Sequence, residues 1–298
     1  MTLHALYDLP APAKLNLFLH IVGRRADGYH LLESVFVLID WADTLHVERR
    51  DDGRLLRHDL GQPLPDDDLC LRAARALQLE SATALGADIS IDKRVPSGAG
   101  MGGGSSDAAT VLLALNRLWG LNWPRQRLLP IAARLGADVP FFVFGRHALV
   151  QGIGDVLAPL ELPTQIYAVV KPHASIATRD IFDSPLLKRD TATAIIMGSL
   201  GGTALAGLGS GYGRNDLQPP AQSQCAEVAQ AARWLEQRFG NSRMTGSGSA
   251  VFSRVGAGDL PLATGSVEDA ALFSALPSGW VGRLCRSLPR HPLWGWAD

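Results

Sequence analysis

The chain has 298 residues, 47% of them hydrophobic, so it can bury a large core and is long enough for two domains of ordinary size. Its 28 Lys and Arg residues nearly balance its 29 Asp and Glu residues, which gives a net charge of −1. This balance argues against binding to nucleic acid or to a membrane surface as the main activity.

The cysteines and the N-terminus indicate a reducing compartment. The three cysteines are Cys70, Cys225 and Cys285, an odd number, and none pairs at the spacing of zinc ligands. Free thiols of this kind are typical of a reducing environment. The N-terminus lacks a basic segment followed by an apolar core, so we expect no signal peptide and a cytoplasmic location.

The first predicted elements are two strands and a helix. Alternating residues over 12–22 and 33–48 predict strands that are joined by the polar turn 23–28. Residues 69–79 predict a helix, and one of Asp66 to Asp68 is expected to be its N-cap.

A glycine-rich loop follows the next predicted strand, in which Ile89, Ile91 and Val95 alternate with polar residues. Within it, residues 98–104 hold five glycines. Apolar residues then recur at helical spacing until Gly120, at Val111, Leu112, Leu115, Leu118 and Trp119. Glycines let backbone N–H groups surround an anion, and the start of a helix adds partial positive charge. The pattern therefore predicts a polyphosphate site.

Three other interpretations of this loop were weighed. The first is a flexible surface loop with a helix cap at Ser105 or Ser106. Glycine density this high before a capped amphipathic helix is rarely without function, which argues against it. A P-loop would need a Lys after the glycines, and none is present. The dinucleotide pattern is formally met by Gly98, Gly100 and Gly103, yet a second predicted helix, 126–135, follows where that pattern needs a strand. A different kind of nucleotide loop remains.

Beyond that helix, the chain passes Gly136 and enters an apolar run up to Gly145, so Asp138 is expected at a helix-to-strand transition. Residues 148–156 predict a strand with a Gly-Ile-Gly kink, and 159–163 are the best candidate linker.

The second half mixes strands and helices without regular βαβ alternation. The predicted elements are a strand at 166–170, a helix at 221–239, strands at 243–245 and 250–255, a helix at 267–275 and a strand at 280–285. This mixture favours an α+β architecture with two domains, 1–160 and 161–298.

The segment 191–213 contains no charged residue, and its length matches that of a membrane span. Gly, Ala, Ser and Thr dominate it, so a short helix followed by a Gly-rich loop is the better prediction.

Three stretches carry candidate chemistry. In the first strand, Lys14 and Asn16 share one face. The second is the glycine loop. The third is Thr245-Gly-Ser-Gly-Ser-Ala250, a turn between two strands that is either an ordinary hairpin turn or a second nest for an anion.

In this order, the three stretches resemble the GHMP kinase superfamily, named for galactokinase, homoserine, mevalonate and phosphomevalonate kinases. The resemblance extends from about residue 10 to about residue 290. Further matching strings are Pro12-Ala-Lys-Leu-Asn-Leu-Phe-Leu-His-Ile21, Arg25-Ala-Asp-Gly-Tyr-His30, Gly136-Ala-Asp-Val-Pro140, Asn215-Asp216 and Arg243-Met-Thr-Gly-Ser-Gly248.

The resemblance implies an N-terminal nucleotide-binding and catalytic domain, a C-terminal ferredoxin-like substrate domain, and an active site in the cleft between them. It implies phosphoryl transfer from ATP with Mg²⁺, with Asp138 as the catalytic base and Lys14 as its partner. It assigns the nucleotide phosphates to the loop residues Pro96, Ser97, Gly98, Ala99, Gly100, Met101, Gly102, Gly103, Gly104, Ser105 and Ser106.

The implied acceptor is an alcohol of isoprenoid precursor synthesis that carries cytidine diphosphate. Tyr29 and Phe182 resemble the aromatic pair that would enclose the cytosine, His30 would read the edge of the base, and Asn16 would contact the alcohol. The resemblance implies no nucleic-acid or membrane partner and a monomer or weak homodimer.

Two features depart from the family pattern. Asp68 stands where Asn is expected, and a carboxylate can only accept hydrogen bonds. Segment 191–213 also looks enlarged. Two alternative functions remain open: a GHMP kinase of the mevalonate or homoserine type, and a catalytically silent nucleotide-binding sensor.

Overall fold

The computed structural model describes residues 3–193, 213–255 and 271–298. Nearly all of the uncharged segment 191–213, and the first residues of the predicted helix 267–275, lie outside these ranges. Among the described helices, none is long and apolar enough to cross a membrane.

The elements largely follow the sequence prediction, and several extend further than expected. The strands are β1 (Ala5–Arg24), β2 (His30–Arg50), β3 (Leu55–Asp59), β4 (Gly86–Asp92), β5 (Ala148–Gln151), β6 (Val156–Pro159), β7 (Ile166–Lys171), β8 (Arg243–Met244), β9 (Val251–Val255) and β10 (Val281–Leu288). The helices are α1 (Leu69–Ser81), α2 (Gly103–Leu118), α3 (Arg125–Leu135), α4 (Val139–Phe144), α5 (Thr178–Asp183), α7 (Gln218–Gln224) and α8 (Ala226–Phe239), with a 3₁₀ turn at Trp294–Trp296.

Across the described residues, the strands form one sheet in the order β3-β4-β2-β10-β7-β9-β8, with β1 and β5 also paired to β2 and β6 paired to β5. Among the strand pairs in the described part of the chain, β3–β4 is the only parallel one. Strand β10 joins the two halves, because it pairs with β2 at one end and with β7 along the rest. The α+β architecture is therefore confirmed, whereas the boundary near residue 160 stays a prediction.

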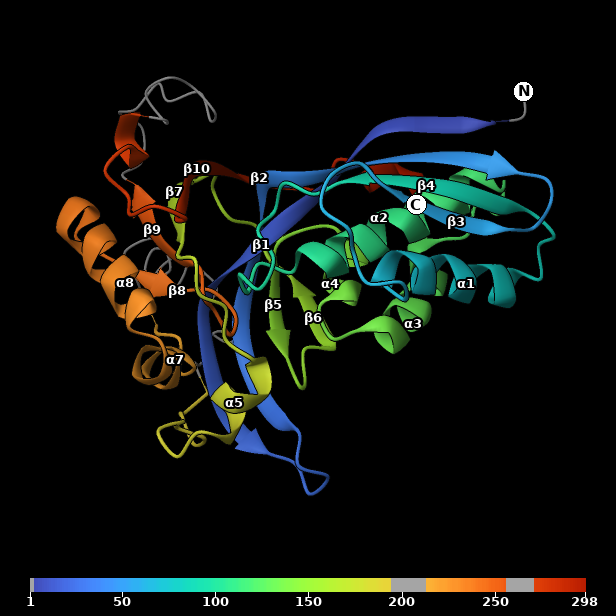
Figure 1. The fold of residues 1–298 in the computed structure, drawn as a ribbon. Helices are drawn as coiled ribbons and strands as arrows, with labels where there is room; N and C mark the ends of the chain where they lie inside the picture. Colours follow the sequence, from blue (N-terminus) through green and yellow to red (C-terminus); the bar gives the residue numbers. More distant parts are fainter. Residues whose placement is uncertain (1–2, 194–212, 256–270) are drawn as a thin grey trace.

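Helices α1 to α4 gather beside the N-terminal strands, and α7 and α8 lie beside the C-terminal strands (Figure 1). Strand β1 crosses from one group to the other. It supplies Leu9 and Ala11 to the first core cluster, Leu15 to the second and Ile21 to the third. The middle of β1 is thus buried on both sides, and its polar residues there need partners inside the protein.

The apolar run after Asp138 is the helix α4, so the expected strand at this point was wrong. Phe141, Phe142 and Val143 are fully buried, and Pro140 lies in the first turn. A helix that is apolar on every side has no visible period, and so a short one cannot be told from a buried strand by sequence.

Two further predictions need correction. The strand expected over 148–156 is a hairpin: β5 ends at Gln151, a turn containing Gly152 and Gly154 at positive φ follows, and β6 returns along β5. The helix expected over 221–239 is two helices separated at Cys225, whose backbone is extended. All three cysteines lie in the described ranges, and none of them is in a disulfide bond.

Candidate functional site

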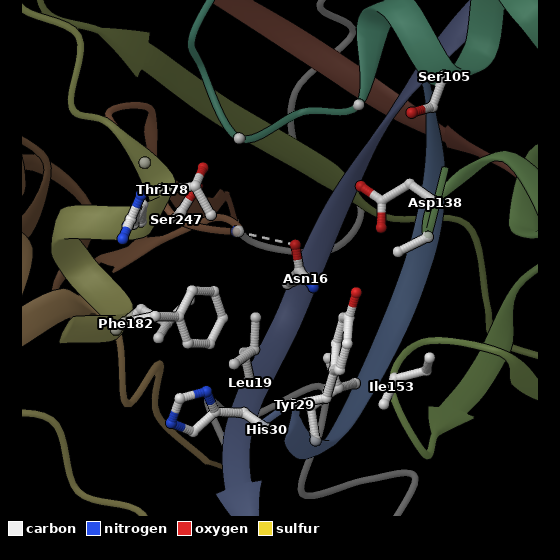
Figure 2. Close-up of a pocket in the computed structure, with 18 of the residues that line it drawn as sticks. Asn16, Leu19, Tyr29, His30, Ser105, Asp138, Ile153, Thr178, Phe182 and Ser247 are labelled. Carbon is white, nitrogen blue, oxygen red and sulfur yellow. Dashed lines mark hydrogen bonds between the residues drawn. The ribbon is translucent and has the colours of Figure 1, made fainter. Parts of the chain in front are cut away.

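A cleft of about 1090 Å³ is lined by β1, β2, the glycine loop, the start of α4, α5 and the turn after β8. Figure 2 shows its walls, with Asp138 and Ser105 at one end and His30 and Phe182 at the other. All six residues predicted for catalysis or acceptor binding line this one cleft: Lys14, Asn16, Tyr29, His30, Asp138 and Phe182.

The glycine loop packs directly against the turn after β8. Gly100 has φ of +72°, and a Cβ there would lie 2.2 Å from Thr245 O. Ser249 N donates to Gly98 O over 3.0 Å, and Ala250 N donates to Ala99 O over 3.1 Å. The two predicted glycine-bearing stretches therefore form one continuous backbone surface at the head of the cleft.

A second cavity of about 480 Å³ lies on the other side of the glycine loop. Gly98, Gly100, Gly102 and Ser105 line both cavities, and the remaining loop residues from 96 to 104 line the second. Ser106 is the exception among the predicted phosphate residues, because it is buried and its hydroxyl donates to Pro12 O over 2.7 Å. The helix α2 begins before it, with Gly102 as N-cap.

A buried charge cluster supports the base of the loop. Lys93 donates to Asp43 and, over 2.5 Å, to Asp107. Asp43 also accepts from the backbone N–H groups of Arg94 and Val95, just before the loop begins. Burial raises the pKa of Asp107 well above its usual range, and the nearby Lys93 opposes this. The cluster fixes the direction in which the chain enters the loop.

Lys14 and Asn16 lie on the same face of β1, as predicted, and contact each other. Lys14 Nζ donates to Asn16 Oδ1 over 2.6 Å and lies 3.5 Å from Asp138 Oδ2. The ammonium also sits 4.7 Å from the centre of the Phe36 ring. Burial lowers the pKa of Lys14, and the negative charge of Asp138 opposes that shift.

Asn16 connects several parts of the site. Its Oδ1 accepts from Lys14, from Thr245 Oγ1 over 3.1 Å and from Gly246 N over 2.8 Å. Its Nδ2 donates to Ser34 Oγ over 3.0 Å, which leaves one amide hydrogen. The residue therefore ties Lys14 to the turn after β8, and one of its amide hydrogens remains for a further contact.

Asp138 stands at the N-cap position of α4 without capping it through its side chain. Its side chain is 31% exposed, and Lys14 is the ion partner 3.5 Å away. The carboxylate is therefore available at the wall of the cleft, beside a buried cation and opposite the glycine loop.

The aromatic residues lie at the other end of the cleft. Tyr29 is 62% exposed on the hairpin between β1 and β2 and faces Phe182 of α5 across the gap (Figure 2). The ring centroids of His30 and Phe182 lie 5.0 Å apart, with the two ring planes tilted by 31°. Arg189 Nε donates to His30 Nε2 over 3.2 Å. Tyr29 and Phe182 thus line opposite sides of a slot in the cleft, with Leu19 between them in this view and His30 beside Phe182 (Figure 2).

Asp68, the departure noted in the sequence, caps α1 by accepting from Leu71 N over 3.1 Å. Its carboxylate also pairs with Arg57 at 3.0 Å and lines the second cavity. Both partners are donors, so a carboxylate, which only accepts, suits them. An uncharged amide would pair less strongly with the Arg57 guanidinium.

Sequence reasoning missed several residues that line or support these cavities. Thr178 and Ser247 join α5 to the turn after β8 through their hydroxyls, which lie 2.8 Å apart. Lys93 and Arg189 were also not predicted. A lysine just before a glycine loop is a sequence signal that could have been used for Lys93, whereas nothing local marks Arg189.

Among the described residues, no three His, Cys, Asp or Glu side chains form a group that could hold a metal ion by themselves. Mg²⁺ in phosphoryl-transfer sites is held by one or two protein oxygens together with phosphate oxygens and water. The hydroxyl of Ser105, which lines both cavities, is compatible with that kind of shared site.

Comparison with known proteins identifies relatives along the whole chain. Residues 68–146 match the GHMP kinases N terminal domain. The 4-diphosphocytidyl-2-C-methyl-D-erythritol kinase of Methylibium petroleiphilum is 61% identical over 297 residues, covering 100% of both chains.

Solved structures agree with this similarity. A crystal structure of 4-(cytidine 5'-diphospho)-2C-methyl-D-erythritol kinase has a TM-score of 0.76 at 32% identity, covering 93% of this chain and 98% of its own. Homoserine kinase from Cytophaga hutchinsonii has a TM-score of 0.68 at 17% identity, covering 97% and 96%, and shows a shared fold alone.

Proposed function

The chain belongs to the 4-diphosphocytidyl-2-C-methyl-D-erythritol kinase family of the GHMP kinases, and from this premise we propose how its own residues perform the reaction. It is an ATP-dependent small-molecule kinase. Its acceptor is 4-diphosphocytidyl-2-C-methyl-D-erythritol, phosphorylated on the 2-hydroxyl in the non-mevalonate route to isoprenoid precursors. The observation that carries this function is the contact of Lys14 with Asp138 in a cleft that the glycine loop closes at one end.

The nucleotide is proposed to lie across the glycine loop. The adenosine part occupies the second cavity, and the phosphates pass over the backbone of Gly100 to Gly102 into the cleft. The N-terminus of α2 lies at that crossing, so its free backbone N–H groups and partial positive charge face the phosphates.

Asp138 takes the proton of the acceptor hydroxyl. The hydroxyl oxygen then forms a bond to the γ-phosphorus while the bond from that phosphorus to the β-phosphate oxygen breaks, and ADP leaves. Lys14 places its positive charge beside Asp138 and offsets negative charge that builds up between acceptor and phosphate. Asn16 holds the ammonium of Lys14 in place through Oδ1.

The cytosine ring of the acceptor enters the slot between Tyr29 and Phe182, where both faces stack on aromatic rings. His30, beside Phe182, reads the edge of the base by a hydrogen bond. Asp138 lies at the end of the cleft opposite His30 and Phe182 (Figure 2), so the erythritol part would lie on the Asp138 side of the bound base.

Mg²⁺ would be shared by the ATP phosphates and the hydroxyl of Ser105. When bound, it supplies positive charge that neutralises the phosphate oxygens. A monomer or weak homodimer in the cytoplasm remains our expectation.

The test is a direct transfer assay. Purified protein is incubated with ATP, Mg²⁺ and one of three acceptors: 4-diphosphocytidyl-2-C-methyl-D-erythritol, mevalonate or homoserine. We expect ADP and a phosphorylated product with the first acceptor alone. Transfer to mevalonate or homoserine in its place would reassign the acceptor, and ATP binding without transfer to any acceptor would indicate a sensor.

A further inference from the structure

We propose that Arg189 sets the tautomer of His30, and that this tautomer makes the acceptor site select cytosine over uracil. The proposal rests on the proposed function, because it concerns the base that the cytidine acceptor places beside His30. It assigns to Arg189 a positioning role in specificity.

The contact between Arg189 and His30 determines which ring nitrogen of His30 carries the proton. Arg189 Nε lies 3.2 Å from His30 Nε2. A guanidinium can only donate hydrogen bonds, so His30 Nε2 is the acceptor and carries no proton. The single proton of a neutral imidazole must then be on Nδ1.

Arg189 cannot easily turn away from this contact. Its Nη1 donates to Leu187 O over 3.1 Å, and its Nη2 donates to Phe182 O over 2.8 Å and to Ser184 O over 3.1 Å. The same guanidinium therefore holds both the segment that carries Phe182 and the imidazole that packs against the Phe182 ring. Arg189 therefore positions both Phe182, which forms one side of the slot, and His30, which supplies its hydrogen-bond donor.

His30 stays neutral in this environment. Burial lowers its pKa, as do the positive charges of Arg189 and Arg24, and only the charge of Asp183 opposes them. In Figure 2 the imidazole lies beside Phe182 with one ring nitrogen turned toward the cleft and the other turned away. Because Arg189 holds Nε2, the nitrogen left for the base is Nδ1, which donates.

A fixed donor distinguishes the two pyrimidines. Cytosine has an unprotonated N3 that accepts a hydrogen bond, whereas uracil has an N3–H group that donates. Uracil would therefore bring two donors face to face and leave both unpaired. Leaving a buried hydrogen-bonding group unpaired reduces affinity about 5- to 150-fold.

The test compares the affinities for CDP and UDP, measured by calorimetry with saturating ADP so that the nucleotide cavity is already filled. We expect wild type to prefer CDP about 5- to 150-fold. Arg189→Met removes the donor to Nε2, so the imidazole can adopt either tautomer and most of this preference should be lost. Arg189→Lys keeps a donor of similar reach and should retain more of the preference.

Arg24→Met is the matched control. Arg24 acts on His30 through charge, and its Nε donates to Gly28 O over 3.0 Å. Arg24→Met removes a positive charge near the His30 imidazole. This change alters the affinities for CDP and UDP alike, because the two ligands share the same diphosphate. The CDP preference should therefore stay as in wild type, and its loss in Arg24→Met would assign selectivity to charge and overturn the proposal.

The tautomer itself is measured by long-range ¹H–¹⁵N NMR of the histidine side chains, with His30→Gln to assign the signal. We expect protonated Nδ1 and unprotonated Nε2 in wild type, and a tautomer mixture in Arg189→Met. A proton on Nε2 in wild type would overturn the proposal, as would an unchanged CDP preference in folded Arg189→Met. This measurement decides the proposal even if the transfer assay fails, and so separates it from the proposed function.

Discussion

The ammonium of Lys14 lies 3.5 Å from the carboxylate of Asp138, near enough for charge attraction but beyond a short hydrogen bond. Its short contact is with Asn16 Oδ1, at 2.6 Å. The lysine is therefore anchored on β1 independently of the carboxylate, and Asp138 keeps oxygen lone pairs for an acceptor hydroxyl.

Asp138→Asn should lower kcat by about 10²–10⁴-fold, since an amide cannot take the proton from the acceptor hydroxyl. Nucleotide affinity should stay close to wild type, because Asp138 lines the cleft and does not line the cavity behind the glycine loop. Steady-state kinetics and calorimetry with ADP measure the two quantities. Turnover at the wild-type rate would remove Asp138 from the mechanism.

Lys14→Met should reduce kcat more than it weakens ATP binding, because its charge matters most as phosphate charge develops. In wild type, burial lowers the pKa of Lys14 from 10.5. The charged form is therefore lost at a lower pH than for a free lysine, and kcat should fall on the alkaline side below pH 10.5. A pH profile of kcat that remains flat up to the pH of protein unfolding would contradict the catalytic role of this ammonium.

Gly102→Val should weaken ATP binding strongly. The glycine has φ of +72°, and a Cβ there would lie 2.9 Å from the Phe142 ring and 3.4 Å from Lys14 Cε. A β-branched residue is strained in that conformation and would displace either the loop or the lysine.

Gly104→Ala is the control for that change. Gly104 is helical, and a Cβ there would have Leu69 as its nearest neighbour at an ordinary 3.8 Å. Gly104 lines the second cavity, but a methyl group there displaces no part of the loop, so ATP affinity should fall far less than in Gly102→Val. Equal ATP affinities for Gly102→Val and Gly104→Ala, both folded, would mean that the loop conformation is not needed for nucleotide binding.

The glycine loop and the pair Lys14 and Asn16 could be found from sequence because each has a local signature. Glycines crowd only where backbone must approach closely, and two polar residues two positions apart share a strand face. The structure places both features on one cleft. Asp138 was also found, but through a resemblance, since its own neighbours indicated a strand.

Contacts between distant parts of the chain could not be predicted. Arg189 reaches His30 across 159 positions, and Thr178 reaches Ser247 across 69. Such pairs depend on how the tertiary fold brings distant segments together, which no local pattern specifies. The helix α4 was missed for a different reason, because complete burial removes the amphipathic period on which the prediction depends.

Tyr29→Ala should raise KM for the cytidine acceptor about 5- to 150-fold and leave ATP affinity nearly unchanged, because a stack of an aromatic ring on a base contributes about 1–3 kcal/mol. Tyr29 lines the cleft and lies away from the cavity behind the glycine loop. Tyr29→Phe keeps the ring and should behave like wild type. If Tyr29→Ala instead weakened ATP binding and left the acceptor KM unaltered, the cytosine slot would have to be placed elsewhere.

The acid stability of the protein depends on the buried histidine His291. This residue is 1% exposed, its Nδ1 accepts from Leu293 N over 3.1 Å, and its backbone N–H donates to Gly145 O at the end of α4. Burial lowers its pKa from 6.5 to about 3. Below pH 6.5, His291 therefore binds a proton in the unfolded chain but stays neutral in the folded chain.

The stabilising effect of this neutral histidine is fully present above pH 6.5 and is lost as the pH falls toward about 3. The loss amounts to about 1.4 kcal/mol for each pH unit in that range. His291→Asn keeps an acceptor and cannot titrate, so its free energy of unfolding should fall less between pH 6.5 and 4 than that of wild type.

Burial lowers the pKa of His147 to about 4, so part of the dependence of stability on pH should persist in His291→Asn. Urea titrations across this range measure the slope, with exposed His4→Asn as control. Parallel slopes for wild type and His291→Asn would show that the protein accommodates a charged His291.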